Sequence, residues 1–350
     1  MKKTVSIILA IAMIAAIIPM SFGCSSEKTL NLLNWGDYLE PSLKDKFKEQ
    51  TGITIKENFV TSNEEMLIKL EAEDCPYDLC IPSDYAVERL ISENCLAEIN
   101  FENIPNYKYI GEDFRNLDFD PENKYSVPYT WGVLGILYNS KMVDESDIGS
   151  WDLLWNDKYA GQVYMYDSIR DSMAAALRYC GYDINTDNPD ELEKAADALI
   201  ELNPNIKAWL TDDVKDNMTL EKGAIALVYS GDAVWCSEPE EGNTDLKFYI
   251  PEEGSNIYFD NIVIPVNSTK KDMAEQFINF LLDPENAVVN TEFIGYSSAN
   301  SEVINLIGQA WVDNPAYNIP IAEAKKNCVI FRDLGSKIEL YNKQWDRVTK

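Results

Sequence analysis

Histidine is absent from the 350-residue sequence, and this absence removes several classes of enzyme. Without an imidazole there is no Ser-His-Asp or Cys-His nucleophile and no zinc site with histidine ligands. A phosphate-binding loop and a dinucleotide fingerprint are also missing. An enzyme would have to use paired carboxylates, as glycosidases do, and no spacing pairs two of the many acids. We therefore expect a protein that is not an enzyme and that needs no cofactor or metal.

Basic residues are scarce relative to acidic ones. Lys and Arg number 30 against 59 Asp and Glu, so the formal net charge is −29. A surface of this sign repels nucleic acid and anionic lipid headgroups, and it attracts cations. The excess of acid could equally serve solubility alone. In either case, nucleic acid is not an expected partner.

Long hydrophobic runs are absent too, apart from one of 14 residues at positions 5–18. That run is shorter than the ~20 residues that span a bilayer. It follows Lys2 and Lys3 and ends before Cys24. These features are typical of a signal peptide over residues 1–23. We expect export of the remaining 327 residues, which carry a net charge of −31 once Lys2 and Lys3 are removed.

The end of the leader resembles the lipobox of bacterial lipoproteins, because Gly23 directly precedes Cys24 and polar residues follow. Ser21 departs from that pattern, since a Leu usually stands three residues before the cysteine. The resemblance predicts lipid attachment at Cys24, which would hold the protein at the outer face of the cytoplasmic membrane. The alternative is ordinary cleavage, which would leave a free thiol and a periplasmic protein.

Six cysteines follow Cys24, and none of them has the CxxC spacing of metal or redox sites. Export permits disulfides, but six cysteines allow 15 pairings and the sequence selects none of them. Their redox state stays open.

Strand-like and helix-like patterns alternate along the chain in two blocks, and Pro41 and Gly52 mark the ends of the first helix. Such alternation predicts an α/β fold with parallel strands, whose ligands bind beyond the carboxyl ends of the strands. The expected strands are residues 29–34, 53–59, 77–81, 162–166, 225–229 and 246–250. The expected helices are residues 41–50, 63–72, 85–93, 168–179, 190–202 and 211–220.

The chain is too long for a single core, which predicts two lobes. Residues 125–138 and 257–265 are apolar, as strands that cross between lobes would be. We assign residues 27–131 plus 261–303 to lobe one and residues 132–260 plus 304–350 to lobe two. The crossing segments should act as a hinge, and we expect a monomer.

Three loops at expected strand ends place aromatic rings beside polar groups. They are Trp35-Gly-Asp-Tyr38, Pro82-Ser-Asp-Tyr85 and Tyr258-Phe-Asp260. A primary ammonium offers three donors and no acceptor, so it favours carboxylate and hydroxyl oxygens. A ring face also attracts the cation, by ~2 kcal/mol where water is excluded. These loops therefore suit a diamine.

At this point the sequence resembles the spermidine/putrescine-binding proteins of ABC importers, which have the type II periplasmic-binding-protein fold. The likeness extends over residues 30–346 and rests on several stretches in a common order. They are Asn34-Trp-Gly-Asp-Tyr38, Tyr77-Asp-Leu-Cys-Ile-Pro-Ser-Asp-Tyr85, Tyr125-Ser-Val-Pro-Tyr-Thr-Trp-Gly132, Ser150-Trp-Asp-Leu-Leu-Trp155, Phe280-Leu-Leu-Asp-Pro284 and Ile294-Gly-Tyr296.

The resemblance implies two lobes, each a mixed sheet flanked by helices, with the ligand in the interlobe cleft. It also implies a function: capture of a linear polyamine and delivery to a membrane permease and its ATPase subunits. In this family an acidic residue after an aromatic one fixes a terminal amine, and Asp260 matches it. Residues matching the rest of the cleft lining are Trp35, Tyr38, Ser83, Tyr85, Tyr258 and Tyr296. Core packing or a turn at a strand end is the alternative role for these positions.

In the opposite lobe, Asp171 matches an acidic residue that receives the other amine in the family. Ser168 stands where spermidine-preferring members have a second acid, and the neighbouring Asp167 could compensate. These residue types also favour the first turn of a helix, which is the simpler explanation of their presence.

The resemblance does not decide between putrescine and spermidine. Putrescine-preferring members have acids matching Asp37 and Asp232, the second of which follows Tyr229 and a short Gly turn, and this favours putrescine. Against this, Tyr replaces Trp at positions 229 and 258, Gly36 replaces a hydroxyl residue, and Phe331 falls near a position where spermidine binders place Gln. Asp37 and Asp232 could also be ordinary surface turn residues.

Relatives of the same fold bind iron or sugars, and these are the alternative ligands. Iron would need clustered anionic oxygens rather than carboxylates between rings. A sugar would need amide and Arg donors, which the three loops lack.

Overall fold

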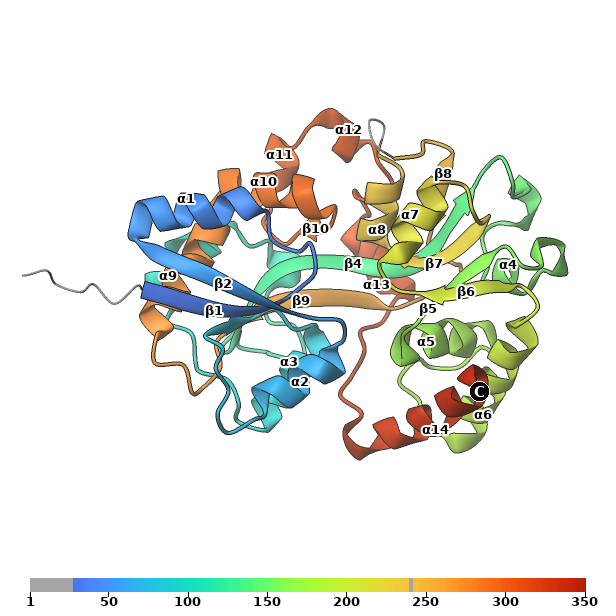
Figure 1. Cartoon of the computed structure of the whole chain (residues 1–350), viewed down its shortest axis with the longest axis horizontal. Coiled ribbons are helices and arrows are strands. Elements are labelled where there is room, and N and C mark those ends of the chain that lie inside the picture. The colour runs from blue at the N-terminus through green and yellow to red at the C-terminus, as the bar shows by residue number, and fades with distance from the viewer. Residues whose placement is uncertain (1–27, 239–241) are drawn as a thin grey trace, which may run out of the picture.

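The structure is a computed structural model that describes residues 28–238 and 242–350. The expected signal peptide and Cys24 lie outside the described residues. The fold is α/β, as predicted, and consists of two bodies joined by long strands that run from one to the other (Figure 1). We call the body around the N-terminal strands lobe one and the other body lobe two.

Lobe one is built on three parallel strands, β1 (Lys28–Trp35), β2 (Ile53–Val60) and β3 (Leu79–Cys80). The helices between and after them are α1 (Pro41–Thr51), α2 (Asn63–Leu70) and α3 (Asp84–Ser92). The predicted end signals of α1 are confirmed, because Pro41 is its first residue and Gly52 has the left-handed φ of 74° that ends a helix. The loops after β1 and β3 open at the carboxyl ends of neighbouring strands.

The two crossing segments are strands. β4 (Ser126–Asn139) pairs antiparallel with β9 (Ile257–Val263) in lobe one and with β7 (Ile225–Tyr229) and β8 (Leu246–Tyr249) in lobe two. All of β4 is buried except the half-buried Tyr138. Because β9 also pairs with β3, the sheets of both lobes join through β4 in the order β2-β1-β3-β9-β4-β7-β5-β6.

Lobe two repeats the parallel arrangement with β5 (Val163–Tyr166), β6 (Ile206–Leu210) and β7. Its main helices are α5 (Ile169–Tyr179), α6 (Pro189–Leu202), α7 (Asp213–Thr219) and α8 (Ser230–Cys236). We did not predict β6 or α8. β6 is an edge strand without a fully buried residue, and α8 begins in a Ser-Gly-Asp sequence that is typical of a turn.

The remaining chain returns to both lobes. α9 (Lys271–Leu281) packs on lobe one and α14 (Ile338–Thr349) packs against α5 and α6 (Figure 1). α10 (Pro284–Ile294) lies between the lobes, since Ala287 joins one core and Ile294 the other. The shorter elements are α4 (Asp152–Trp155), β10 (Ser297–Ser298), α11 (Val303–Leu306), α12 (Gln309–Val312), α13 (Ile321–Asn327) and the 3-10 helices Phe101–Asn103, Pro105–Tyr109, Glu112–Phe114, Glu145–Asp147, Asp157–Tyr159 and Gly335–Lys337.

Each lobe has its own hydrophobic core. Phe47 and Phe277 are fully buried in the first core, and Trp151 and Tyr341 in the second. The first core also takes in Ala324, near the end of the chain. The residue boundaries given above for the lobes stay a proposal.

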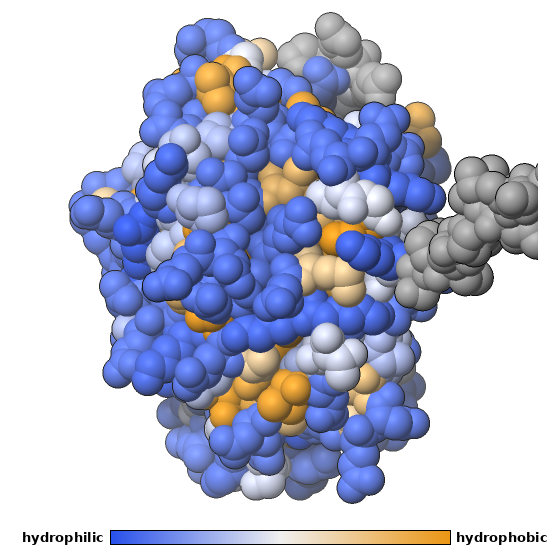
Figure 2. Space-filling view, turned by 90° about the vertical axis from the view of Figure 1, so that its left-hand side faces the viewer, coloured by the Kyte–Doolittle hydropathy of each residue, from blue (hydrophilic) through white to orange (hydrophobic). Residues whose placement is uncertain are grey.

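The surface agrees with the acidic composition. Figure 2 looks at the lobe-one end of the molecule and shows mostly hydrophilic side chains with scattered apolar ones. Within the described residues, no helix has both the length and the apolar character needed to cross a membrane. The six cysteines between positions 75 and 328 are free thiols in this structure.

Candidate ligand-binding site

A cavity of about 560 Å³ lies between the lobes and takes residues from both. Every position that we predicted as ligand-binding lines it: Trp35, Asp37, Tyr38, Ser83, Tyr85, Asp167, Ser168, Asp171, Tyr229, Asp232, Tyr258, Asp260 and Tyr296. The structure therefore brings these residues together around one space. Their role in binding a ligand stays a prediction.

Asp260 occupies the centre of the lobe-one wall. It lies on β9 opposite Thr130 of β4, and Ser83 at the start of α3 bridges to it. The Tyr38 hydroxyl donates a 2.5 Å hydrogen bond to its Oδ2, and the Ser83 hydroxyl donates a 2.7 Å bond to its Oδ1. Tyr38 is also 2.6 Å from the Thr130 hydroxyl. Among the residues that the structure describes, the side chains that hydrogen-bond to Asp260 are thus neutral hydroxyl groups.

This environment sets the charge of Asp260. Burial raises its pKa from 3.8 to about 6, and the hydroxyl groups of Tyr38, Ser83 and Thr130 act in the opposite direction. No basic side chain of the described residues contributes to this balance. At neutral pH the carboxylate is ionised and buried without a counter-ion, so a cationic ligand would relieve its desolvation.

Asp171 lies on the lobe-two wall, in the first turn of α5. Its Oδ2 accepts a 2.7 Å hydrogen bond from the Tyr229 hydroxyl and a 2.5 Å bond from Ser168, the residue that caps the helix. Burial raises the pKa of Asp171, while the two hydroxyls and the nearby Arg170 lower it. The predicted role of Ser168 as the N-cap of a helix is therefore confirmed. Ser168 also lines the cavity.

Asp232 is a further buried carboxylate of the lining, in the first turn of α8. The Tyr296 hydroxyl donates a 3.0 Å hydrogen bond to its Oδ1. Burial raises the pKa of Asp232, and Lys215 and Tyr296 lower it. Gly231 is needed beside it, because a Cβ there would lie 2.2 Å from the Tyr296 ring.

Tyrosine rings fill the space between the carboxylates. Tyr38 meets Tyr296 edge to face at 5.2 Å, and Tyr229 meets Tyr258 in the same way at 5.2 Å. Gly132 lets Tyr258 approach the backbone, since a Cβ there would lie 2.2 Å from the phenol oxygen. These rings offer flat faces to an aliphatic chain and negative faces to a cation.

The other predicted residues lie nearer the rim. Asp37 and Asp167 are exposed, and Asp37 has a left-handed φ of 50°. Trp35 is half-buried and its indole N–H donates to the Ile81 carbonyl. The Tyr85 hydroxyl donates to Glu64 on α2.

Asp84 differs from the other acids of the cavity although it lies in the Pro82-Ser-Asp-Tyr85 motif. Its carboxylate accepts the backbone N–H groups of Phe259 at 3.0 Å and Tyr85 at 2.7 Å. Oδ2 thus ties α3 to β9, while Oδ1 is bound within the first turn of α3, and Asp84 has a structural role.

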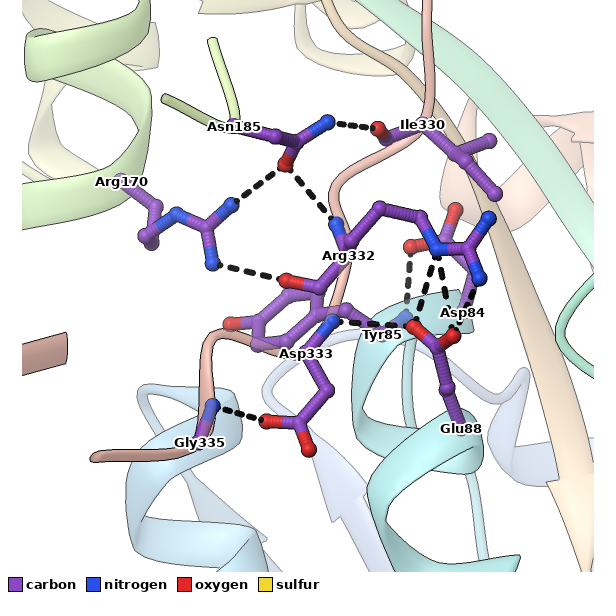
Figure 3. A network of polar contacts seen from close by, with 9 residues as sticks. All are labelled: Asp84, Tyr85, Glu88, Arg170, Asn185, Ile330, Arg332, Asp333 and Gly335. Carbon is purple, nitrogen blue, oxygen red and sulfur yellow. Dashed lines mark hydrogen bonds and ion pairs between the residues drawn. The ribbon is translucent and has the colours of Figure 1, made fainter. Parts of the chain in front are cut away.

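The sequence analysis missed two cations in the lining, Arg170 and Lys215. Arg170 lies next to Asp171, but its guanidinium donates to the Asn185 side chain and to the Arg332 carbonyl (Figure 3). It also lies 4.3 Å from the centre of the Phe331 ring. Arg170 is therefore a fixed cation of the cavity lining, beside the rings of Phe331 and Tyr85.

Arg332 belongs to a segment that links the lobes (Figure 3). Its guanidinium pairs with Glu88 on α3 of lobe one, and its backbone N–H donates to Asn185 of lobe two at 2.9 Å. The backbone N–H of Asp333 donates to Glu88 as well, at 2.9 Å. Single residues of this kind carry no sequence pattern, so sequence analysis had no signal for them.

The lining offers no metal centre. Among residues 28–238 and 242–350, no three acidic or cysteine side chains come together in a way that could hold a metal ion. The cavity holds separate carboxylates with rings between them, which suits an extended ligand with separated charges.

Two lobes around such a cavity define a solute-binding protein of the periplasmic type. Residues 42–319 match the family model described as bacterial extracellular solute-binding protein. The chain belongs to this family, whose members are transport proteins and not enzymes.

Individual relatives confirm the family resemblance that the motifs predicted. The chain is 32% identical over 323 residues to the spermidine/putrescine-binding periplasmic protein of Escherichia coli K12, covering 92% of each chain. It is 28% identical to the putrescine-binding periplasmic protein PotF of the same organism, covering 95% of each.

Two solved structures share the architecture. One is the spermidine/putrescine ABC transporter substrate-binding protein PotD from Streptococcus pneumoniae, with 36% identity and a TM-score of 0.79 over 92% of this chain and 98% of that chain. The other is the Tp0655 (TpPotD) lipoprotein of Treponema pallidum, with 29% identity and a TM-score of 0.82 over 92% and 99%.

Proposed function

We propose that this chain captures a linear polyamine, putrescine or spermidine, between its lobes and delivers it to the permease and ATPase subunits of an ABC importer. One observation carries this proposal. Asp171, Asp232 and Asp260 are buried around one interlobe cavity, and the side chains that donate hydrogen bonds to their carboxylates carry hydroxyl groups. The relatives named above for spermidine and putrescine support it.

The chemistry of the cavity fits a polyamine at both ends and in the middle. An ammonium would donate to the carboxylate of Asp260 and to the hydroxyl oxygens around it, each charge-assisted bond contributing roughly 1.5–3 kcal/mol. The methylenes would pack on the rings of Tyr38, Tyr258 and Tyr296. A second ammonium would reach Asp171 in the other lobe, so a bound ligand would bridge the lobes and favour the closed state.

The predicted lining residues and lobe boundaries form part of this proposal. Residues of lobe one would hold one ammonium, residues of lobe two the other, and β4 and β9 would bend as a hinge. Closure would then present a surface to the permease, for which we propose a monomeric binding protein.

The family is extracellular, and the relatives are named periplasmic, which supports export of this chain. We extend this to lipid anchoring at Cys24 after removal of residues 1–23. The lipobox-like sequence supports this anchoring, and the similarity to a Treponema pallidum lipoprotein agrees with it. Labelling of the full-length protein with a radioactive fatty acid in a bacterial host, against a Cys24→Ala variant, would test it.

Isothermal titration calorimetry tests the function. The protein from residue 24 onward, with Cys24→Ser, is titrated with putrescine, spermidine, ferric citrate and maltose. We expect one-to-one binding of a polyamine and no heat from the other two ligands. Absence of binding to both polyamines would refute the proposal.

A further inference from the structure

Tyr38 of the cavity lining is in contact with a second tyrosine, Tyr129 of β4. The Tyr129 hydroxyl donates a 3.0 Å hydrogen bond to the backbone carbonyl of Tyr38, and the two rings meet edge to face at 5.9 Å. Tyr129 is buried and does not line the cavity. Any effect of Tyr129 on a bound ligand must therefore pass through a lining residue, and Tyr38 is the one that it holds.

An irregularity of β4 explains how Tyr129 reaches Tyr38. Thr130 pairs with Asp260 of β9, whereas Pro128 pairs with the very next residue of β9, so Tyr129 is an extra residue on β4, as in a β-bulge. A bulge re-aims side chains that would otherwise alternate between the two faces of a strand. Thr130 lies 2.6 Å from the Tyr38 hydroxyl, while the neighbouring Tyr129 binds the Tyr38 carbonyl. Adjacent residues of β4 thus hold both the side chain and the backbone of Tyr38.

Asn290 of α10 supports Tyr129 from the other side. Its side-chain N–H donates a 2.7 Å hydrogen bond to the Tyr129 hydroxyl, and its Oδ1 accepts a 3.0 Å bond from the backbone N–H of Glu40. Glu40 is the residue that caps α1. Asn290 is buried and, like Tyr129, does not line the cavity. Together these two residues bind the loop before α1 at Tyr38 and again at its last residue.

The loop that they bind has an unfavourable backbone conformation. Asp37, directly before Tyr38, has a left-handed φ of 50°, which is uncommon for a residue other than glycine. Such a conformation persists where the surrounding structure holds it in place. Tyr38 must keep one orientation to donate its 2.5 Å hydrogen bond to Asp260. The bonds from Tyr129 and Asn290 are placed to maintain that orientation.

We propose that Tyr129 and Asn290 are positioning residues of the ligand site: they hold Tyr38 where it binds Asp260 and presents its ring to a polyamine. This inference rests on the proposed function and adds to it two residues that do not line the cavity. Holding a site in its binding conformation lowers the entropic cost of binding. Loss of either residue should therefore weaken all polyamines by a similar factor.

Calorimetry with putrescine and spermidine, together with thermal unfolding of the free proteins, tests these roles. Tyr129→Phe removes the hydroxyl and keeps the ring, and Asn290→Ala leaves Tyr129 in place. Tyr249→Phe is the matched control, because the Tyr249 hydroxyl also donates a 3.0 Å hydrogen bond to a backbone carbonyl, that of Ser150, and Tyr249 does not line the cavity. Tyr129→Phe is also combined with Tyr38→Ala, to measure whether Tyr129 acts through Tyr38.

We expect Tyr129→Phe to weaken both ligands about tenfold and Asn290→Ala about threefold, because buried partners of the loop are left unpaired. Tyr249→Phe should keep the wild-type affinity even where it lowers the unfolding temperature as much as Tyr129→Phe does. In the Tyr38→Ala background, Tyr129→Phe should weaken binding no further, because the residue through which it acts is gone.

Three results would overturn the inference and leave the proposed function standing. They are wild-type affinity in Tyr129→Phe, an equal loss of affinity in Tyr249→Phe, and a further tenfold loss when Tyr129→Phe is added to Tyr38→Ala. If Tyr129→Phe does not fold, Asn290→Ala decides the question, and wild-type affinity in that variant would overturn the inference. Failure of the unaltered protein to bind either polyamine would overturn both.

Discussion

The two walls of the cavity hold their carboxylates in different ways. Asp260 of lobe one lies on a strand, is fixed by the hydroxyls of Tyr38 and Ser83, and has no basic side chain from the described part of the chain acting on it. Asp171 and Asp232 of lobe two lie in first turns of helices and have Arg170 and Lys215 nearby. The charge of the first wall is thus uncompensated, whereas that of the second is partly balanced inside the chain. A cationic ligand should gain most from Asp260.

The largest expected effect comes from removing that charge. Asp260→Asn keeps the shape of the side chain but takes away the anionic partner of a buried ammonium, a loss of ~2–5 kcal/mol, or roughly 30-fold in affinity or more. Calorimetry with putrescine and spermidine measures it. The free variant should unfold at the same temperature or higher, because a buried carboxylate of raised pKa is replaced by a neutral amide.

Asp171→Asn and Asp232→Asn are the matched variants on the other wall. Asp171→Asn should weaken putrescine about tenfold, and Asp232→Asn less, because Lys215 already compensates Asp232. If either variant lost as much affinity as Asp260→Asn, the contrast between the walls would not hold.

The pH dependence of binding follows from the same contrast. Asp260 has a pKa of about 6 in the free protein, and an ammonium needs its ionised form. Affinity should therefore be constant at pH 7–8 and fall by up to about tenfold per pH unit below 6, since putrescine stays fully protonated there. Titrations from pH 4.5 to 8 check this. A flat profile down to pH 5 would contradict the assignment, and Asp260→Asn should show a weaker slope.

Stability of the free protein should change in the opposite direction. The folded pKa of Asp260 lies above its ordinary value of 3.8, so the folded state binds the proton more tightly than the unfolded chain. The contribution of this group to stability is thus present below about pH 4 and is lost as the pH rises through 6. Thermal unfolding of the free protein against Asp260→Asn isolates that contribution.

The sequence predicted those elements of the fold that have a periodic hydrophobic pattern or a family motif. The strands and helices between residues 29 and 93, most of those between residues 162 and 250, the crossing strand β4 and the loops that carry Tyr38, Ser83 and Asp260 all have such signals, whereas α9, α10 and α14 were not predicted. The edge strand β6 and helix α8 lacked them, since one has no fully buried residue and the other starts like a turn.

The balance of charge in the cavity could not be predicted in the same way. Arg170 of α5 and Lys215 of α7 enter the lining through the way these helices pack, and that depends on tertiary structure. The family resemblance supplied positions for the carboxylates but not the cations beside them. For this reason the difference between the two walls became visible only in the structure.

The smallest expected effect concerns the ion pair between Arg332 and Glu88, which links the two lobes outside the cavity. The guanidinium of Arg332 pairs with Glu88 of lobe one, while its backbone is bound to Asn185 of lobe two (Figure 3). The side chains of Arg332 and Glu88 are 42% and 25% exposed, so the pair should contribute only ~0.2–1 kcal/mol. Because it holds the lobes together, Arg332→Gln should weaken polyamine binding by up to about fivefold, equally for putrescine and spermidine.

The control for this contact is an ion pair within one lobe. Arg347 pairs with Asp197 at 2.6 Å, and both residues lie in lobe two. Arg347→Gln should leave affinity unchanged, and Glu88→Gln combined with Arg332→Gln should cost no more than either change alone, because the same contact is lost. If Arg332→Gln instead altered the ratio of the two ligands, the segment around Phe331 would act on the cavity lining and not only on the approach of the lobes.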